Sequence, residues 1–344
     1  ISKPYLVPKR NLTKNNLPFP YGNNEPKDTV FANVDYSKLT AAVNNAFDSK
    51  GQKKKRSRAV LVIYKDHIIA EKYDTGFTKN SKILGWSMTK SITATLFGIL
   101  QKQGKYDINK PAPIPEWQKD ERKKITTNDL LHMNSGLEWE EAYDKICDAT
   151  KMLFIAEDMG RVQLEKPAAF APNTHWNYSS GTSNLLSYIL RKQFKTHQEY
   201  LDFWYAQLID RIGMHSMLIE TDMVGNYVGS SYGWATARDW AKFGLLYLHK
   251  GNWNGDQVFD PSWENYVSTP TNDSKEGYGA HFWLNAGGHF PAAPRDMYSC
   301  NGYQGQKVFI IPSLDLVIVR MGLSDEGKYD VNELLAGVIG SFKK

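Results

Sequence analysis

Residues 87–100 read Ser-Met-Thr-Lys-Ser-Ile-Thr-Ala-Thr-Leu-Phe-Gly-Ile-Leu. The apolar residues recur at helical spacing, which predicts a long apolar helix that opens at Ser87 and ends near Gly104. Ser87 and Lys90 lie one turn apart, so their side chains share one face of that helix. A serine hydroxyl needs a base beside it, and a lysine becomes a base when burial lowers its pKa. The stretch therefore indicates a reactive serine, aided by backbone N–H groups at the helix N-terminus.

The four-residue pattern alone identifies no site, because it recurs by chance at residues 341–344. The ordinary structural interpretation of Ser87 is a helix N-cap followed by an exposed Lys90, since serine is favoured at that position. Two further elements of the sequence favour the catalytic interpretation.

The first is the polar segment Asn177-Tyr178-Ser179-Ser180-Gly181, which precedes a helix predicted from about Asn184. A tyrosine there could carry a proton between the nucleophile and the leaving group. The alternative is a half-buried tyrosine at the margin of the core.

The second is Asn301-Gly302-Tyr303-Gln304-Gly305-Gln306, beside the predicted strand at 307–311. Glycines let the backbone approach a ligand closely, as an oxyanion hole made from a strand N–H requires. The alternative is a glycine-bearing hairpin turn.

Predicted strands at both ends of the chain enclose a mostly helical middle. The simplest assembly is an α+β fold in which N- and C-terminal strands form one mainly antiparallel sheet, with a site at the seam between two lobes. We expect an extended arm over residues 1–34, an α/β lobe from about 35–85 and 250–344, and a helical lobe from about 86–249. The predicted strands are 59–64, 67–73, 278–285, 297–300, 306–312 and 314–321, and the predicted helices are 38–47, 87–100, 128–133, 184–193, 236–249 and 331–342.

With these elements in order, the chain resembles the serine β-lactamase and penicillin-binding protein superfamily from about residue 58 onward. Within it, the pattern is similar to the class C β-lactamase-related hydrolases, including 6-aminohexanoate-dimer hydrolases and family VIII esterases. The stretches that carry the resemblance are 87–91, 125–139, 177–181, 235–244 and 302–317.

The resemblance implies that residues 35–344 form a β-lactamase-like domain with Ser87 as nucleophile. It implies that Lys90 and Tyr178 share the proton transfers, with either as the base. It also implies an oxyanion hole from the backbone N–H groups of Ser87 and Tyr303, with Cys300 as a substitute for Tyr303. The residues expected to contact substrate are Trp86, Ser180, Gly302 and Gln304.

Two departures from class C β-lactamases narrow the expected activity. Ser180 stands where their Tyr-x-Asn motif has asparagine, and residues 297–300 lack the lysine of their Lys-Thr-Gly motif. The expected function is therefore a serine hydrolase that acylates on Ser87 and cleaves an ester or amide. The alternatives are a D-alanyl peptidase, a weak β-lactamase, or a protein of this fold that acylates or binds without turnover.

Other classes of protein fit less well. An α/β-hydrolase would need a final glycine after Gly85-Trp86-Ser87-Met88 and strands that alternate with helices. The net charge of +5 is small for 344 residues, and no zinc-finger, RNP or homeodomain pattern indicates a nucleic-acid partner. The histidines and the two cysteines show no metal-ligand spacing, so no metal or cofactor is expected.

Tryptophans 86, 139, 176 and 283 could line a cleft for an apolar acyl group, or fill the core as such large side chains usually do. The expected partner is a small ester or amide, with no membrane span and the oligomeric state open. Because the chain begins at Ile1, we expect an exported protein whose signal has been removed, with a cytoplasmic location as the alternative.

Overall fold

One antiparallel sheet joins the two ends of the chain, as predicted. The structure, a computed structural model, describes residues 6–49, 54–325 and 329–343. The six strands run in the order β2-β1-β11-β10-β9-β8, so the first strands in sequence pair with the last. Their bounds are β1 Ser57–Tyr64, β2 His67–Tyr73, β8 Trp283–Leu284, β9 Tyr298–Gly302, β10 Gln306–Ile311 and β11 Leu316–Gly322.

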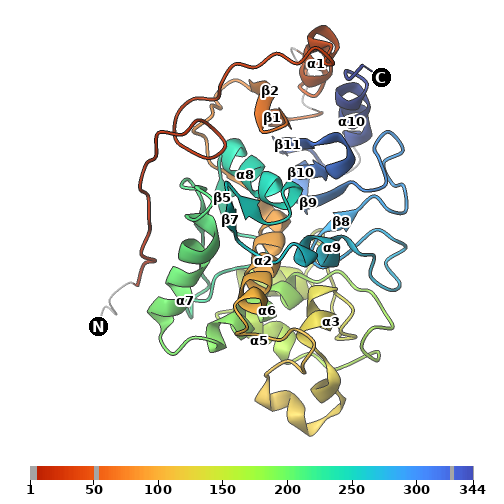
Figure 1. The fold of residues 1–344 in the computed structure, drawn as a ribbon. Helices are drawn as coiled ribbons and strands as arrows, with labels where there is room; N and C mark the ends of the chain where they lie inside the picture. Colours follow the sequence, from red (N-terminus) through yellow and green to blue (C-terminus); the bar gives the residue numbers. More distant parts are fainter. Residues whose placement is uncertain (1–5, 50–53, 326–328, 344) are drawn as a thin grey trace.

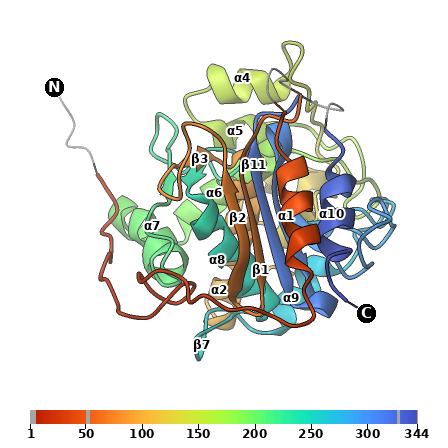
Figure 2. The same ribbon diagram turned by 90° about the horizontal axis from the view of Figure 1, so that it is seen from above.

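Helices cover both faces of this sheet (Figures 1 and 2). Helices α1 (Tyr36–Asn45) and α10 (Val331–Ile339) pack on one face, and α8 (Ala237–Leu248) packs on the other. Alternate residues of β1 therefore enter two separate apolar clusters, Leu61 and Ile63 in one and Val60 and Val62 in the other. Burial on both faces explains why this strand is continuously apolar rather than alternating.

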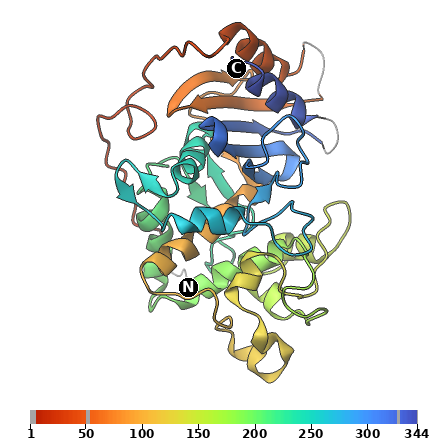
Figure 3. The same ribbon diagram turned by 45° about the vertical axis from the view of Figure 1, so that its right-hand side comes forward.

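The segment between α2 and α8 is mostly helical and lies below the sheet in the views of Figures 1 and 3. Helix α2 (Thr89–Lys102) runs from the sheet into this region, and its residues from Thr89 to Leu100 are all buried. The other helices there are α3 Thr127–Leu131, α4 Asp148–Phe154, α5 Met159–Leu164, α6 Ser180–Lys192 and α7 His197–Trp204.

Several short elements complete the description. They are strands β3 Ile83–Leu84, β4 Leu218–Ile219, β5 Gly233–Ala235, β6 Asn252–Trp253 and β7 Asp256–Gln257, helix α9 Ser262–Ser268, 3₁₀ segments at 86–88, 115–119, 121–124, 303–305 and 312–314, and a π-helical turn at 205–209. No helix in the described ranges is both long and apolar enough to cross a bilayer.

The strand predicted over residues 278–285 is largely wrong. Only Trp283 and Leu284 form a strand, because His281 has a left-handed backbone (φ 62°) that interrupts an extended run. Gly279 also lies directly against the carbonyl of Val267, where a Cβ would come within 2.0 Å of that oxygen. Since β8 is so short, Tyr298 and Ser299 are the only residues of β9 that it pairs with, and in the described structure the rest of β9 has no strand partner on that side.

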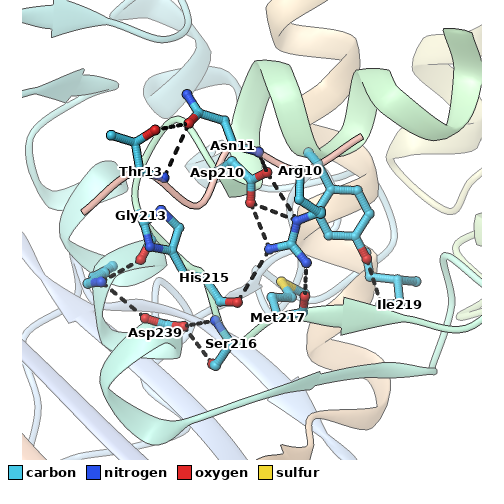
Figure 4. Close-up of polar contacts among 12 residues, drawn as sticks. Arg10, Asn11, Thr13, Asp210, Gly213, His215, Ser216, Met217, Ile219 and Asp239 are labelled. Carbon is cyan, nitrogen blue, oxygen red and sulfur yellow. Dashed lines mark hydrogen bonds and ion pairs between the residues drawn. The ribbon is translucent and has the colours of Figure 1, made fainter. Parts of the chain in front are cut away.

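The N-terminal segment before α1 is held against the body of the protein by a charged contact (Figure 4). The Arg10 guanidinium donates to the Asp210 carboxylate at 2.7–3.0 Å and to the carbonyl of Met217 at 3.2 Å. It also lies 4.1 Å from the centroid of the Tyr205 ring. The Asp210 side chain is only 2% exposed, so its charge depends on Arg10 and on the N–H of Asn11.

Replacing Arg10 should show how much the buried Asp210 carboxylate depends on it. Arg10→Ala leaves a buried carboxylate without its cation, so we expect the free energy of unfolding to fall by about 2–3 kcal/mol. Chemical denaturation measures the loss. Lys9→Ala, at an exposed neighbouring position, is the control and should change stability by less than about 0.5 kcal/mol. Equal effects of the two substitutions would show that Arg10 does not anchor the segment.

Candidate active site

Ser87 lies in a 3₁₀ turn that immediately precedes α2. The turn spans Trp86–Met88, so the α-helix itself begins two residues later than predicted. The N-cap of α2 is Met88, and Ser87 makes no capping hydrogen bond, which excludes the N-cap interpretation. Ser87 is half-buried and faces a cavity.

The residue before the serine has an unusual backbone. Trp86 has φ 49°, in the left-handed region that costs a bulky residue about 1–3 kcal/mol. Its carbonyl accepts a hydrogen bond from Thr89 Oγ1 at 2.8 Å, and its ring packs edge-on against Tyr232 and Tyr303. These contacts hold the sharp turn that displays Ser87.

Lys90 is buried directly behind Ser87. Its side chain is 1% exposed, which rules out the exposed lysine of the ordinary interpretation. The ammonium has three N–H groups, and the structure gives it three acceptors. These are Ser87 Oγ at 3.0 Å, Ser180 Oγ at 2.9 Å and the carbonyl oxygen of Ser230 at 2.9 Å.

This environment changes the proton affinity of the lysine. Burial lowers the pKa of Lys90 to about 8, and the negative charge of Glu141 opposes that shift. A lysine with this pKa is partly neutral near physiological pH. It can therefore take a proton from a hydroxyl 3.0 Å away.

Tyr178 stands on the other side of the serine, just before α6. Its ring centroid lies 5.0 Å from Lys90 Nζ, and the ring packs against Tyr278 and Trp283. Burial raises the pKa of Tyr178 well above its ordinary value, while a hydrogen bond with Ser87 lowers it. The phenol is therefore neutral at physiological pH and available as a proton donor.

Glu141 lies behind these groups, and the sequence interpretation missed it. Its carboxylate accepts hydrogen bonds from Trp139 Nε1, the Tyr143 hydroxyl, and both the backbone N–H and the hydroxyl of Ser180. Ser180 is the first residue of α6, so the carboxylate also faces a helix N-terminus, where negative charge is stabilised. Lys90, Ser180 and Glu141 thus form one hydrogen-bonded chain.

The end of β9 approaches the turn that carries Ser87. A Cβ on Gly302 would come within 2.1 Å of the carbonyl oxygen of Gly85, so glycine is required for this contact. Tyr303 follows directly and lies with its ring 5.8 Å from that of Trp86. Cys300, the substitute considered for the oxyanion hole, is fully buried inside the strand.

These residues surround a cavity of about 740 Å³. Of the predicted site residues, Ser87, Tyr178, Gly302 and Tyr303 line it. The cavity wall does not include the other predicted residues. Trp86, Ser180 and Gln304 lie outside the lining, with Ser180 buried behind Lys90 and the carbonyl of Gln304 bonded to the N–H of Ser324.

Three of the four tryptophans can be assigned to one of the two predicted roles, lining the cleft or filling the core. Trp176 and Trp283 line the cavity, whereas Trp139 is buried in an apolar cluster near α4 and α5. In the described part of the chain, no group of three or more His, Cys, Asp or Glu side chains is placed to hold a metal ion. The chemistry available at the cavity is that of a serine hydroxyl between an amine and a phenol.

Comparisons with known proteins identify the family and the fold. The β-lactamase family model matches residues 43–334. A putative 6-aminohexanoate-dimer hydrolase from Bacillus anthracis has a similar structure, at 21% identity and TM-score 0.68 over 83% of this chain and 78% of its own. A family VIII carboxylesterase is similar at 15% identity and TM-score 0.70, over 92% of this chain and 100% of its own.

A class C β-lactamase mutant is similar at 15% identity and TM-score 0.67, over 91% of this chain and 99% of its own. No curated protein matches the sequence. At these identities the solved structures establish the fold, and the match to the family model over most of the chain establishes the family. The chain therefore belongs to the β-lactamase family and has the β-lactamase/transpeptidase-like fold.

Proposed function

We propose that this protein is a serine hydrolase that cleaves an ester or amide through an acyl-enzyme on Ser87. The observation that carries the proposal is the contact of 3.0 Å between Ser87 Oγ and the fully buried Lys90 Nζ. Membership of a family of β-lactamase-fold hydrolases, with esterases among the similar structures, supports the same reaction class.

In the acylation step, Ser87 Oγ attacks the substrate carbonyl carbon as neutral Lys90 takes the hydroxyl proton. The carbonyl oxygen becomes an oxyanion, which the backbone N–H groups of Ser87 and Tyr303 are proposed to stabilise. The bond to the leaving group then breaks as Tyr178 gives that group a proton. The high pKa of Tyr178 and the lowered pKa of Lys90 support this division of roles.

In the deacylation step, water attacks the acyl carbon and loses a proton to the same groups, and the bond to Ser87 Oγ breaks. The step returns the serine hydroxyl and releases the carboxylic acid. A protein that acylates without this step would be a binding protein of the same fold. Efficient β-lactam hydrolysis is disfavoured, because no lysine lies on β9 to receive the β-lactam carboxylate.

Loss of the serine should abolish turnover. Ser87→Ala removes the attacking oxygen, so hydrolysis of p-nitrophenyl esters and covalent labelling by a fluorophosphonate should both disappear. The free energy of unfolding should change by no more than about 1–2 kcal/mol, because the half-buried hydroxyl loses only its hydrogen bonds with Lys90 and Tyr178. The release of p-nitrophenol measures hydrolysis, mass spectrometry measures labelling, and chemical denaturation measures the free energy of unfolding.

The serine of the chance repeat provides a matched control. Ser341→Ala, in the pattern at 341–344, should retain labelling and turnover. Full esterase activity in Ser87→Ala would refute the proposal. Labelling of Ser87 without recovery of free enzyme from any ester or amide would refute hydrolysis while leaving the nucleophile in place.

The value of kcat/KM should rise as Lys90 loses its proton. Below pH 8, kcat/KM should rise about tenfold per pH unit and then level off, because only the neutral amine accepts the proton. Glu141→Gln removes the charge that raises the pKa of Lys90. The neutral amine then forms at lower pH, so the rise of kcat/KM on the acidic side of the pH profile should move to lower pH.

The pH dependence of kcat/KM for a neutral ester tests this expectation. Glu138→Gln, at an exposed position in the same acidic segment, is the control and should leave the limb in place. A shift to higher pH in Glu141→Gln, or an equal shift in both variants, would show that Glu141 does not tune Lys90.

A further inference from the structure

The hydroxyl of Thr89 connects the turn that carries Ser87 to a neighbouring strand, and it takes no part in the reaction steps described above. Thr89 is the first residue of α2 and is fully buried. A hydroxyl can donate one hydrogen bond and accept others, and this one does both. It donates to the carbonyl of Trp86 at 2.8 Å and accepts from the N–H of Gly233, in β5, at 3.0 Å.

The bond to Gly233 takes the place of a backbone bond between strands. Gly85 follows the last residue of β3, and its N–H extends the pairing with β5 by donating to the carbonyl of Gly233 at 2.8 Å. A hydrogen-bonded antiparallel pair would return a second bond, from the N–H of Gly233 to the carbonyl of Gly85. That carbonyl instead accepts from the N–H of Met88, because the chain turns away from β5 at this point. Thr89 therefore supplies the acceptor that the turn removes.

Close packing leaves the turn little freedom to move. A Cβ on Gly233 would come within 2.7 Å of Thr89 Oγ1, and a Cβ on Gly85 would come within 2.3 Å of the Trp240 ring. Gly302 of β9 lies against the carbonyl of Gly85 with the same restriction. The turn at 85–88 is thus packed against both β5 and β9, and it can move only if these neighbours move with it.

The contact with Trp86 determines where the N–H of Ser87 points. The carbonyl of Trp86 and the N–H of Ser87 belong to one planar trans peptide unit, so they point in opposite directions. Thr89 fixes this carbonyl twice, through its hydroxyl and through its backbone N–H. The N–H of Ser87 therefore points away from Thr89. It has no acceptor among the residues that the structure describes, and Ser87 itself borders the cavity.

The left-handed backbone of Trp86 makes this restraint necessary. A residue in that conformation is strained, and it stays there only while its surroundings hold it. Relaxation of Trp86 would rotate the peptide unit between residues 86 and 87, which would move the N–H of Ser87. Without the Thr89 hydroxyl, that peptide unit loses one of its two restraints, and the buried N–H of Gly233 loses its acceptor.

We propose that Thr89 is a positioning residue that aims the backbone N–H of Ser87 at the oxyanion formed during acylation. This inference rests on the proposed function, which gives that N–H its role. Donors held in place before the reaction stabilise the charge that develops in the transition state, and loss of one such donor costs roughly 10²–10³-fold in kcat. Thr89 does not line the cavity. Its loss should misdirect the donor rather than remove it, so the cost should be smaller, roughly 10- to 100-fold.

Thr89→Val keeps the shape of the side chain and removes the hydroxyl. For a p-nitrophenyl ester, kcat should fall roughly 10- to 100-fold while KM changes less than about twofold, because the cavity wall is unaltered. Thr89→Ser, which retains the hydroxyl, should keep at least about half of the wild-type kcat. The final extent of fluorophosphonate labelling counts the folded enzyme in each sample, so that kcat refers to folded protein alone. Wild-type kcat in Thr89→Val, or a kcat in Thr89→Ser as low as in Thr89→Val, would overturn the inference.

Thr95→Val is the matched control on the same helix. The Thr95 hydroxyl is also fully buried, donates to the carbonyl of Ser91 at 2.7 Å and lies 2.7 Å from the Tyr247 hydroxyl. This variant should melt at a lower temperature, as Thr89→Val should, but kcat should stay within about twofold of the wild type. An equal loss of kcat in both variants would show a general effect of lost buried hydrogen bonds and would overturn the role of Thr89.

A substrate with sulfur in place of the reacting carbonyl oxygen gives a readout that a purely structural role of Thr89 would not change. Sulfur is a weak hydrogen-bond acceptor, so the charge that develops on it gains little from the N–H of Ser87. The wild type should therefore prefer the p-nitrophenyl ester to its thiono analogue, and Thr89→Val should reduce that preference roughly 10-fold. An equal fall in kcat for the two substrates would contradict the proposed aiming of this N–H.

Thr89→Cys provides the same test if Thr89→Val does not fold. Its thiol is a weaker donor and acceptor than a hydroxyl, so kcat and the preference for the oxygen ester should both fall, but less than in Thr89→Val. Wild-type values of both in Thr89→Cys would overturn the inference. Hydrolysis by the wild type with an unchanged preference in Thr89→Val would overturn the role of Thr89 and leave the hydrolase intact. Absence of both hydrolysis and labelling in the wild type would overturn the proposed function, and this inference with it.

Discussion

The burial of one lysine ammonium among three oxygen acceptors is the constraint on which the site depends. Lys90 must leave water, and the cost of doing so lowers its pKa to about 8. Its three acceptors come from the turn before α2, from the start of α6 and from the segment before β5. The same contacts that satisfy the charge therefore also bring together distant parts of the chain.

Glu141 limits how far burial lowers the pKa of Lys90. A lysine with no negative charge nearby would become neutral at still lower pH, and the hydrogen-bonded chain through Ser180 would lose its terminal acceptor. The carboxylate is itself stabilised by four donors and by the start of α6. The site thus balances the fully buried Lys90 against the partly buried Glu141, with the serine at one end of the network.

The sequence predicted those parts of the structure that local patterns determine. The pairing of the terminal strands followed from apolar runs, and the approach of Lys90 to Ser87 followed from helical spacing. Glu141 could not be identified, because it is one of three glutamates in residues 138–141 and only the path of the loop turns it inward. The role of Thr89 could not be identified either, because the strand residue that its hydroxyl contacts lies 144 residues further along the chain.

The pairing of β1 with β11 also has a consequence for synthesis on the ribosome. The hairpin of β1 and β2 and the apolar helix α2 emerge early, whereas β9, β10 and β11 emerge last. Until then, one edge of β1 and the buried face of α2 lack the partners that cover them, a condition in which nascent chains aggregate. Because the sheet pairs strands from the two ends of the chain, its contacts are long-range and form slowly. A chain that stops before β9 contains the nucleophile but not the strand residues that complete the cavity.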